Sequence, residues 1–295
     1  MVVRKLASIR VVALAAILGT VWQSPRAEEN ATRHTSDSAS CARSTFRVVV
    51  DVGHTATSPG ADSARGVHEY EFNLKLADVI AQSLRDAGFD ETVRLITSGT
   101  RFASLFKRAA SANHLHADLF LSIHHDSVPD NLKERWDYEG KKNYYSDRFS
   151  GYAIFASNDN ADRVDSLAFG HSLGQELQKR GLHYTPHYTL PVMGRFRHEL
   201  VDPEAGVYRY DHLRVLHSTL MPAVLLEAGS IVNRQEELEL ATPERRLIVA
   251  EAVTAAVEDF CARKGQTVAN RPAANAPGFI ATAPSQRVRP ASFSR

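Results

Sequence analysis

Cysteine is scarce in this chain of 295 residues, which contains only Cys41 and Cys261. That count excludes a zinc site built mainly on cysteine. Cys41 precedes the first predicted strand and Cys261 lies near the end of the last predicted helix, so the pair brackets the region that we expect to fold. In an oxidising compartment such a pair can form a disulfide between the two ends of a domain; two unpaired thiols are the alternative.

An excess of either charge is also lacking. The chain has 35 Lys and Arg against 34 Asp and Glu, which gives a formal net charge of +1. This balance gives no sign of a polyanionic partner, so we expect no nucleic-acid binding. The length and the 43% hydrophobic content suit one sizeable globular domain, and no internal repeat divides it.

A hydrophobic run long enough for a comfortable membrane span is missing from the start of the chain. Basic residues are followed there by a short uncharged apolar stretch, 11–22, which is the layout of a secretory signal. We therefore expect 1–27 to be a signal peptide, the mature protein to be periplasmic or extracellular, and no stable membrane span after processing. Pro25 is poorly placed for cleavage after Ala27, so retention as an uncleaved anchor is the alternative.

Composition divides the remainder of the chain into three parts. Residues 28–45 are small and polar and read as a linker, and residues 264–295 form a tail rich in Pro, Ala and Arg that we expect to be disordered. The folded part is expected to be one domain over 46–263.

Strands and helices alternate along 46–263. This order predicts an α/β fold with a single domain, in which a mixed, mostly parallel central sheet is flanked by helices on both faces. The predicted strands are 46–52, 91–98, 117–127, 151–157, 221–230 and a short one at 214–218, and the predicted helices are 71–89, 104–115, 166–182 and 243–261.

Three apolar strands are followed by, or end in, a residue that can bind a metal or transfer a proton. The strand "VVVDVGH" ends at His54, "LFLSIHH" contains His124 and "AVLLE" ends at Glu227, while Glu69 opens the first helix. Strand ends far apart in sequence converge at one edge of such a sheet. Zinc hydrolases take three N or O ligands from the protein and leave one position for water, and a further carboxylate can act as the general base.

Four ordered motifs carry a resemblance to a known family. The chain resembles the zinc-dependent N-acetylmuramoyl-L-alanine amidases, cell-wall hydrolases whose first strand ends in Asp-Pro-Gly-His. Val52 replaces the usual Pro of that motif and Thr55 replaces the usual Gly that follows it. The motifs are "VVVDVGHTATSPGA", "GVHEYEFNLKLADVIAQSLRDAGF", "TSGTRFASLFKRAASANHLHADLFLSIHHDS" and "VLHSTLMPAVLLEAGSIVNRQEELEL".

The resemblance implies a set of roles. His54, Glu69 and His124 would bind Zn²⁺, and Glu227 would activate the water that attacks the substrate. The substrate would be peptidoglycan or its muropeptides, cut at the amide between N-acetylmuramic acid and L-alanine.

Neighbouring residues leave alternatives to this set. His68 and His125 each adjoin a proposed ligand, although successive strand residues face opposite sides, so His124 and His125 cannot both reach one metal. Asp51 either orients a ligand imidazole from behind or caps a turn.

Two segments, 129–150 and 186–206, are longer than the family minimum and rich in aromatic residues, Arg and His. We hypothesise that they wall the cleft, with Arg195, Arg197 or His198 near a substrate carboxylate; solvated surface loops are the alternative.

Two rival functions use the same residues. One is a zinc peptidase of related fold that acts on another peptide or amide. The other is a non-catalytic exported wall-binding protein, against which the presence of all four site residues argues.

Overall fold

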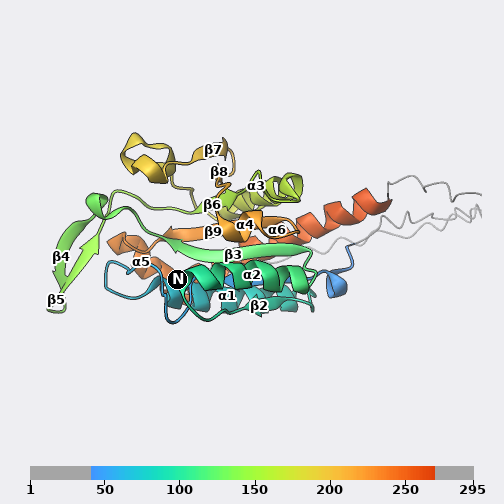
Figure 1. Cartoon of the computed structure of the whole chain (residues 1–295), viewed down its shortest axis with the longest axis horizontal. Coiled ribbons are helices and arrows are strands. Elements are labelled where there is room, and N and C mark those ends of the chain that lie inside the picture. The colour runs from blue at the N-terminus through green and yellow to red at the C-terminus, as the bar shows by residue number, and fades with distance from the viewer. Residues whose placement is uncertain (1–40, 270–295) are drawn as a thin grey trace, which may run out of the picture. The chain divides into compact units, whose positions relative to one another are not determined.

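The structure is a computed structural model that describes residues 41–269 (Figure 1). The expected signal peptide, 1–27, and most of the linker, 28–45, lie outside the described residues, as does most of the tail, 264–295.

A seven-stranded sheet forms the centre of the fold, in the order β2-β1-β3-β9-β6-β8-β7. The first four strands of that order are mutually parallel, β9 and β6 pair antiparallel, β6 and β8 pair in parallel, and β8 and β7 pair antiparallel. The prediction of a mixed, mostly parallel sheet is confirmed. The strands are β1 (Val48–Val52), β2 (Val93–Leu95), β3 (Leu119–Asp126), β6 (Ala153–Ala156), β7 (Glu199–Asp202), β8 (Val207–Arg209) and β9 (Ala223–Ser230).

Helices cover both faces of the sheet, as expected for strands buried on both sides. Alternate residues of β1 show the two sides: Val48 and Val50 pack with three long helices, whereas Val49 packs with residues of two other helices and of the segment 186–206. The first face carries α1 (Glu69–Asp86), α3 (Arg163–Lys179) and α6 (Pro243–Ala269), and the second carries α2 (Arg101–His114) and α4 (Arg214–His217).

The remaining elements are short. Strands β4 (Glu134–Tyr138) and β5 (Lys141–Tyr145) form a separate antiparallel hairpin, which projects at the left of Figure 1. Within residues 41–269 no helix has both the length and the apolar character required to cross a bilayer. The others are helix α5 (Arg234–Leu240) and the 3-10 helices η1 (Arg43–Thr45), η2 (Asp130–Leu132), η3 (His187–Thr189) and η4 (Pro191–Phe196).

Residues 214–218 were predicted as a short strand, and this was wrong. The segment forms α4, with Val215 and Leu216 buried on the second face of the sheet. In so short a segment, the apolar residues cannot show whether their period is 2, as in a strand, or 3.6, as in a helix. Packing against α2 therefore determines the local structure.

Helix α6 also extends past residue 263, where the folded part was expected to end. Lys264 forms ion pairs with Asp162 and Asp165 at the start of α3, which holds the added turn against the domain. After Pro243 at its start, the helix contains no further proline, and its single glycine, Gly265, does not end it.

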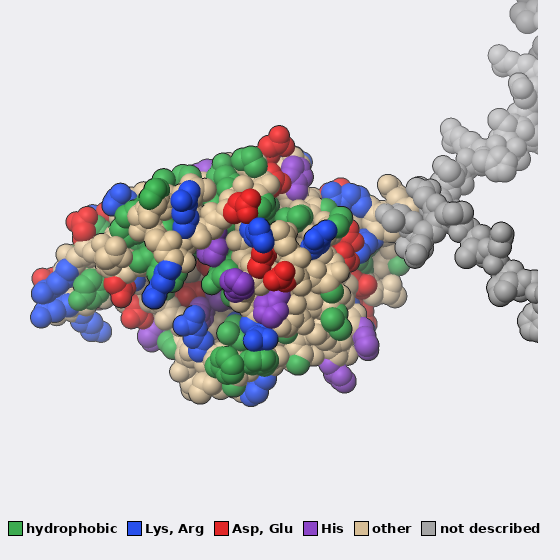
Figure 2. Space-filling view, turned by 45° about the horizontal axis from the view of Figure 1, so that its top comes forward, with side chains coloured by type: hydrophobic (Ala, Val, Ile, Leu, Met, Phe, Trp, Pro, Cys, Tyr) green, Lys and Arg blue, Asp and Glu red, His purple; other side chains and the backbone are tan. Residues whose placement is uncertain are grey.

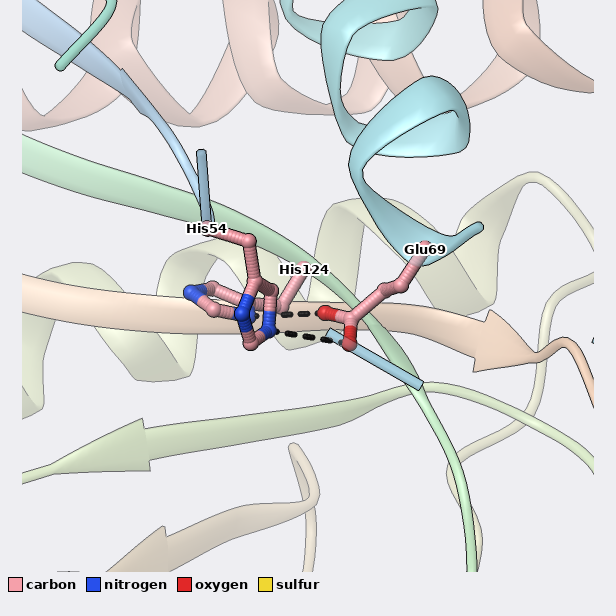
Figure 3. A group of neighbouring side chains, drawn as sticks. All are labelled: His54, Glu69 and His124. Carbon is pink, nitrogen blue, oxygen red and sulfur yellow. Dashed lines mark hydrogen bonds and ion pairs between the residues drawn. The ribbon is translucent and has the colours of Figure 1, made fainter. Parts of the chain in front are cut away.

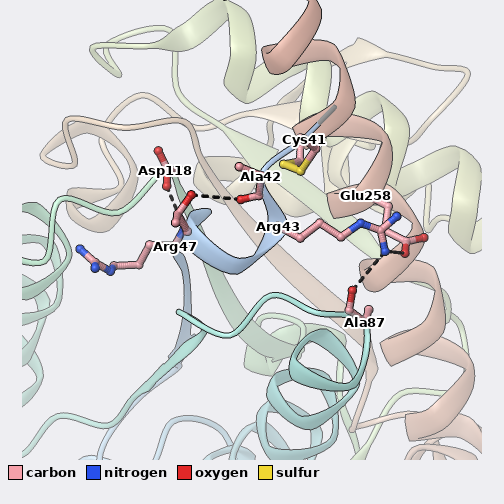
Figure 4. The surroundings of a disulfide bond; sticks show 9 residues. Cys41, Ala42, Arg43, Arg47, Ala87, Asp118 and Glu258 are labelled. Atoms are coloured by element: carbon pink, nitrogen blue, oxygen red, sulfur yellow. Dashed lines mark hydrogen bonds and ion pairs between the residues drawn. A yellow bond between two sulfur atoms is a disulfide. The ribbon is translucent and has the colours of Figure 1, made fainter. Parts of the chain in front are cut away.

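A disulfide joins Cys41 to Cys261, with Cα atoms 5.3 Å apart and 220 residues of sequence separation (Figure 4). It ties the start of the described chain to α6. Arg43 strengthens the same contact, because its guanidinium pairs with Glu258 of α6 at 2.5 Å and donates to the carbonyl of Ala87 at 3.1 Å.

Candidate metal centre and active site

His54 lies in the loop that follows β1, at the carboxyl edge of the sheet. Its φ of +68° is in the left-handed region, which is costly for a residue with a side chain. The preceding Gly53 still pairs with β3, donating from its N–H to the carbonyl of Ile123 at 2.9 Å. This turn directs the imidazole toward α1, and its Nε2 lies 2.9 Å from Oε2 of Glu69.

Glu69 is the first residue of α1, and a carboxylate is favoured at that position by the helix dipole. Its Oε1 lies 2.9 Å from Nδ1 of His124, and it also accepts from the amide of Asn73 at 3.3 Å. Burial alone would raise the pKa of Glu69, but the hydrogen bonds with His124 and His54 hold that pKa well below its usual range.

His124 and His125 point to opposite faces of β3, as strand geometry requires. His124 shares the face of α2 and meets Glu69, whereas Nδ1 of His125 pairs with Asn73 at 2.7 Å beneath α1. Burial lowers the pKa of His124 to about 4, so its ring is neutral at pH 7, the form in which imidazole binds metals. The other alternative, His68, pairs with the exposed Asp62 instead.

The three side chains form a compact donor set (Figure 3). One ring nitrogen each of His54 and His124 and one oxygen of Glu69 lie within 4.8 Å of one another. A tetrahedral zinc ion with bonds of about 2.0–2.2 Å holds its donors roughly 3.3–3.6 Å apart, a value between the 2.9 Å of the two His–Glu69 contacts and the 4.8 Å limit of the set. Two imidazoles with one carboxylate are also ligands that zinc prefers. The residues therefore fit Zn²⁺.

Glu227 lies on β9 opposite His124, which is its Cα partner on β3. Paired residues on neighbouring strands share a face, so both side chains border one cavity with His54. Among the described residues, the buried Oε2 of Glu227 has no hydrogen-bond partner. Burial, with the nearby carboxylates of Asp126 and Glu69, raises the pKa of Glu227 well above its usual value.

The cavity that contains these groups has a volume of about 940 Å³. Both long segments contribute to its wall, the first through Pro129 and its neighbours and the second through residues 192–196 and His198. Arg195 and His198 line the cavity, whereas Arg197 does not. Figure 2 shows a hollow on this side of the molecule with Lys, Arg and His side chains around it.

Comparison with known proteins assigns this arrangement to a family. The family model described as N-acetylmuramoyl-L-alanine amidase matches residues 48–259. The chain belongs to the N-acetylmuramoyl-L-alanine amidase family. It is therefore a hydrolase of that family, and the resemblance drawn from the four motifs is confirmed.

Relatives and solved structures of this amidase family agree with the assignment. The N-acetylmuramoyl-L-alanine amidase AmiA of Escherichia coli is 27% identical over 235 residues, which cover 72% of this chain and 75% of AmiA. The probable cell wall amidase LytH of Staphylococcus aureus is 26% identical over 70% of this chain and 55% of its own length. The catalytic domain of the amidase CwlV from Bacillus (Paenibacillus) polymyxa var. colistinus is 25% identical, with a TM-score of 0.53 over 72% of this chain and 96% of that domain. Ami1 from Mycobacterium smegmatis shares the fold, with 18% identity and a TM-score of 0.55 over 74% of this chain and 97% of Ami1.

Asp51 lies behind the amidase site but contacts no imidazole among the described residues. Its Oδ2 accepts from the hydroxyl of Ser122 at 2.7 Å, and its Oδ1 lies 3.5 Å from Nε of Arg108. Burial raises the pKa of Asp51 to about 6, against the opposing effects of Arg108 and Ser122. Asp51 therefore does not orient a ligand imidazole by direct contact.

Two buried residues beside the donor set were not predicted from the sequence. Arg108 is buried in α2 and contacts Asp51; an arginine among the apolar positions Leu105, Ala109 and Ala112 of a predicted helix was the available signal.

The second missed residue is Tyr188, which lines the cavity and donates its hydroxyl to Asp126 at 2.6 Å. Its ring packs against Phe155 and Tyr208, so it fastens the segment 186–206 to the sheet. The sequence contains a signal only for its partner, because alternation along β3 places Asp126 on the same face as His124.

Small residues let the backbone approach the donor set closely. A Cβ at Gly53 would lie 2.5 Å from Nε2 of His124, and one at Gly60 would lie 2.4 Å from Oε2 of Glu69. Gly60 also has a φ of +85°, so glycine satisfies both the space and the backbone conformation there.

Proposed function

We propose that this protein is a zinc-dependent amidase that hydrolyses the bond between the lactyl group of N-acetylmuramic acid and L-alanine in peptidoglycan. One observation supports this most directly: the unpartnered, buried carboxyl oxygen of Glu227 borders the same cavity as the imidazoles of His54 and His124. Because the substrate lies outside the cytoplasm, we also propose that the protein is exported to the periplasm or the cell exterior.

The metal would be held by His54, Glu69 and His124, and when bound it would lower the pKa of water and polarise the amide carbonyl. Glu227 would accept the proton of the attacking water and then transfer it to the amine nitrogen of the leaving alanine. A raised pKa suits a group that must first take up and then release a proton. A carboxylate that binds a metal is ionised, so Glu69 would act as a ligand while Glu227 carries the proton.

Digestion of purified sacculi tests this function. We expect soluble products with free lactyl groups and new N-terminal L-alanine, and we expect a chelator to stop their formation until Zn²⁺ is restored. A zinc peptidase would instead create new ends within the stem peptides. A wall-binding protein without catalysis would sediment with the sacculi and release nothing.

Substrate contacts are proposed for Arg195 and His198, which reach the cavity from the segment 186–206. Arg195 has no carboxylate partner among the described residues, so its guanidinium is available to a carboxylate of the stem peptide.

Replacing Arg195 with Ala should raise KM for a muropeptide by about 10- to 100-fold with little change in kcat, because a hydrogen bond to a charged group contributes about 1.5–3 kcal/mol. Steady-state kinetics on a defined muropeptide measures this. Arg85→Ala removes the same charge from the exposed side of α1 and serves as the control. An unchanged KM in Arg195→Ala would refute the contact.

A further inference from the structure

Among the residues that the structure describes, Arg108 is the largest side chain that is almost fully enclosed, with 1% of the residue exposed. A buried guanidinium is costly unless its donors are satisfied, and here three groups contact it. It donates to the backbone carbonyl of His54, its Nε lies 3.3 Å from the hydroxyl of Thr97, and the same nitrogen forms the ion pair with Asp51.

Fold stability is a weak explanation for this arrangement. Removing two charges from water costs about as much as their attraction returns, so a well-packed apolar pair commonly serves stability equally well. The Arg108–Asp51 pair is fully buried, with 2% and 0% of the two side chains exposed. What an apolar residue could not supply at position 108 is the hydrogen bond to the carbonyl of His54.

That hydrogen bond acts on the strained part of the loop. Among the described non-glycine residues, only His54, His116 and Glu139 have a positive φ. Such a conformation persists only when its surroundings hold it, at a cost on the order of 1–3 kcal/mol. The His54 carbonyl belongs to the peptide plane that follows the ring-bearing Cα, so holding the carbonyl holds the backbone from which the imidazole extends toward Glu69.

The surroundings would let the ring move if this hold were lost. A small cavity of about 90 Å³ is bordered by His54, His124 and Arg108. The ring of His54 also keeps 22% of its side chain exposed, so packing alone does not immobilise it.

We propose that Arg108 is a positioning residue for the metal centre, and that Asp51 influences that centre through Arg108. Asp51 orients the guanidinium from one side and the guanidinium holds the His54 carbonyl on the other. The inference rests on the proposed zinc site. It goes beyond the ligand set, because it says that Arg108 and Asp51, which are not ligands, determine the position of the ligand His54.

Zinc affinity of the purified full chain tests the proposal. The apo proteins are titrated with Zn²⁺ in competition with a chromophoric chelator, and the Co²⁺ absorption spectrum reports the geometry of the site. Arg108→Met should raise the Kd for Zn²⁺ by about 10- to 100-fold, as is usual for residues that orient metal ligands, and should alter the Co²⁺ spectrum. Asp51→Asn should have a smaller effect of the same kind.

The double variant Arg108→Met/Asp51→Asn distinguishes an indirect role of Asp51 from a direct one. If Asp51 acts through Arg108, the double variant should bind Zn²⁺ no more weakly than Arg108→Met alone. Additive losses would overturn that part of the proposal. Arg108→Lys, which retains the charge beside Asp51, provides a second variant should Arg108→Met fold poorly, and it should also bind Zn²⁺ more weakly.

Arg47→Met is the matched control. Arg47 likewise donates to a backbone carbonyl, that of Leu115, and pairs with Glu91, but it lies at the opposite end of β1 from His54. This variant should lose stability in denaturant titrations and keep the Kd for Zn²⁺. An unchanged Kd in folded Arg108→Met would refute the positioning role while leaving the proposed function intact, whereas a wild-type protein that binds no Zn²⁺ would refute both.

Discussion

Replacing Glu227 with Gln should lower kcat on a muropeptide by about 10²- to 10⁴-fold and leave zinc binding unchanged. The amide keeps the shape of the side chain but can neither accept the proton of the attacking water nor return it to the leaving amine. Burial and two neighbouring carboxylates raise the pKa of Glu227, which agrees with the proton transfer proposed for it. Turnover and metal content are to be measured on the same preparation.

Glu71→Gln makes the same chemical change on the exposed part of the first turn of α1 and is the control. It should retain wild-type kcat and zinc content. Full activity in Glu227→Gln would remove this residue from the mechanism, and loss of zinc in that variant would instead place Glu227 among the ligands.

Removing the disulfide with Cys41→Ser/Cys261→Ser should lower the free energy of unfolding by about 2–5 kcal/mol. The bond closes a loop of 220 residues, so its loss increases the conformational entropy of the unfolded chain and favours unfolding. Urea titration of the oxidised wild type and the double variant measures the difference. Zinc affinity should be preserved, because neither cysteine borders the cavity.

Reduction provides an independent check on that stability change. A reductant should shift the unfolding midpoint of the wild type toward that of the double variant and should leave the double variant unaffected. Equal midpoints for the oxidised wild type and the variant would show that the contacts of Arg43 with Glu258 and Ala87 suffice to hold the ends together.

The wall of the cavity and the donor set come from different parts of the fold. The donor set and Glu227 come from two central strands, the loop after β1 and the start of α1, whereas Arg195 and His198 come from the segment 186–206. Tyr188 fastens that segment to Asp126 on β3, only two residues beyond His124. This part of the cavity wall and the proposed metal centre are therefore both attached to β3.

Local sequence was enough to predict the α/β order of the domain and to name His54, Glu69, His124 and Glu227. Strand and helix periods are properties of short segments, and carboxyl ends of parallel strands meet at one edge of a sheet whatever the loops between them do. Strand alternation likewise predicts that His124 and His125 face opposite sides of the sheet and cannot both reach one metal.

The tertiary structure decided what depends on packing between distant segments. The left-handed backbone of His54, the reach of Arg108 from α2 to that backbone, and the placement of Arg195 but not Arg197 at the cavity all arise from contacts across many residues of sequence. The same is true of α4, whose four residues carry no usable period and take their helical form against α2. Sequence periodicity reports which side of an element is buried, and only the folded chain determines which buried groups meet.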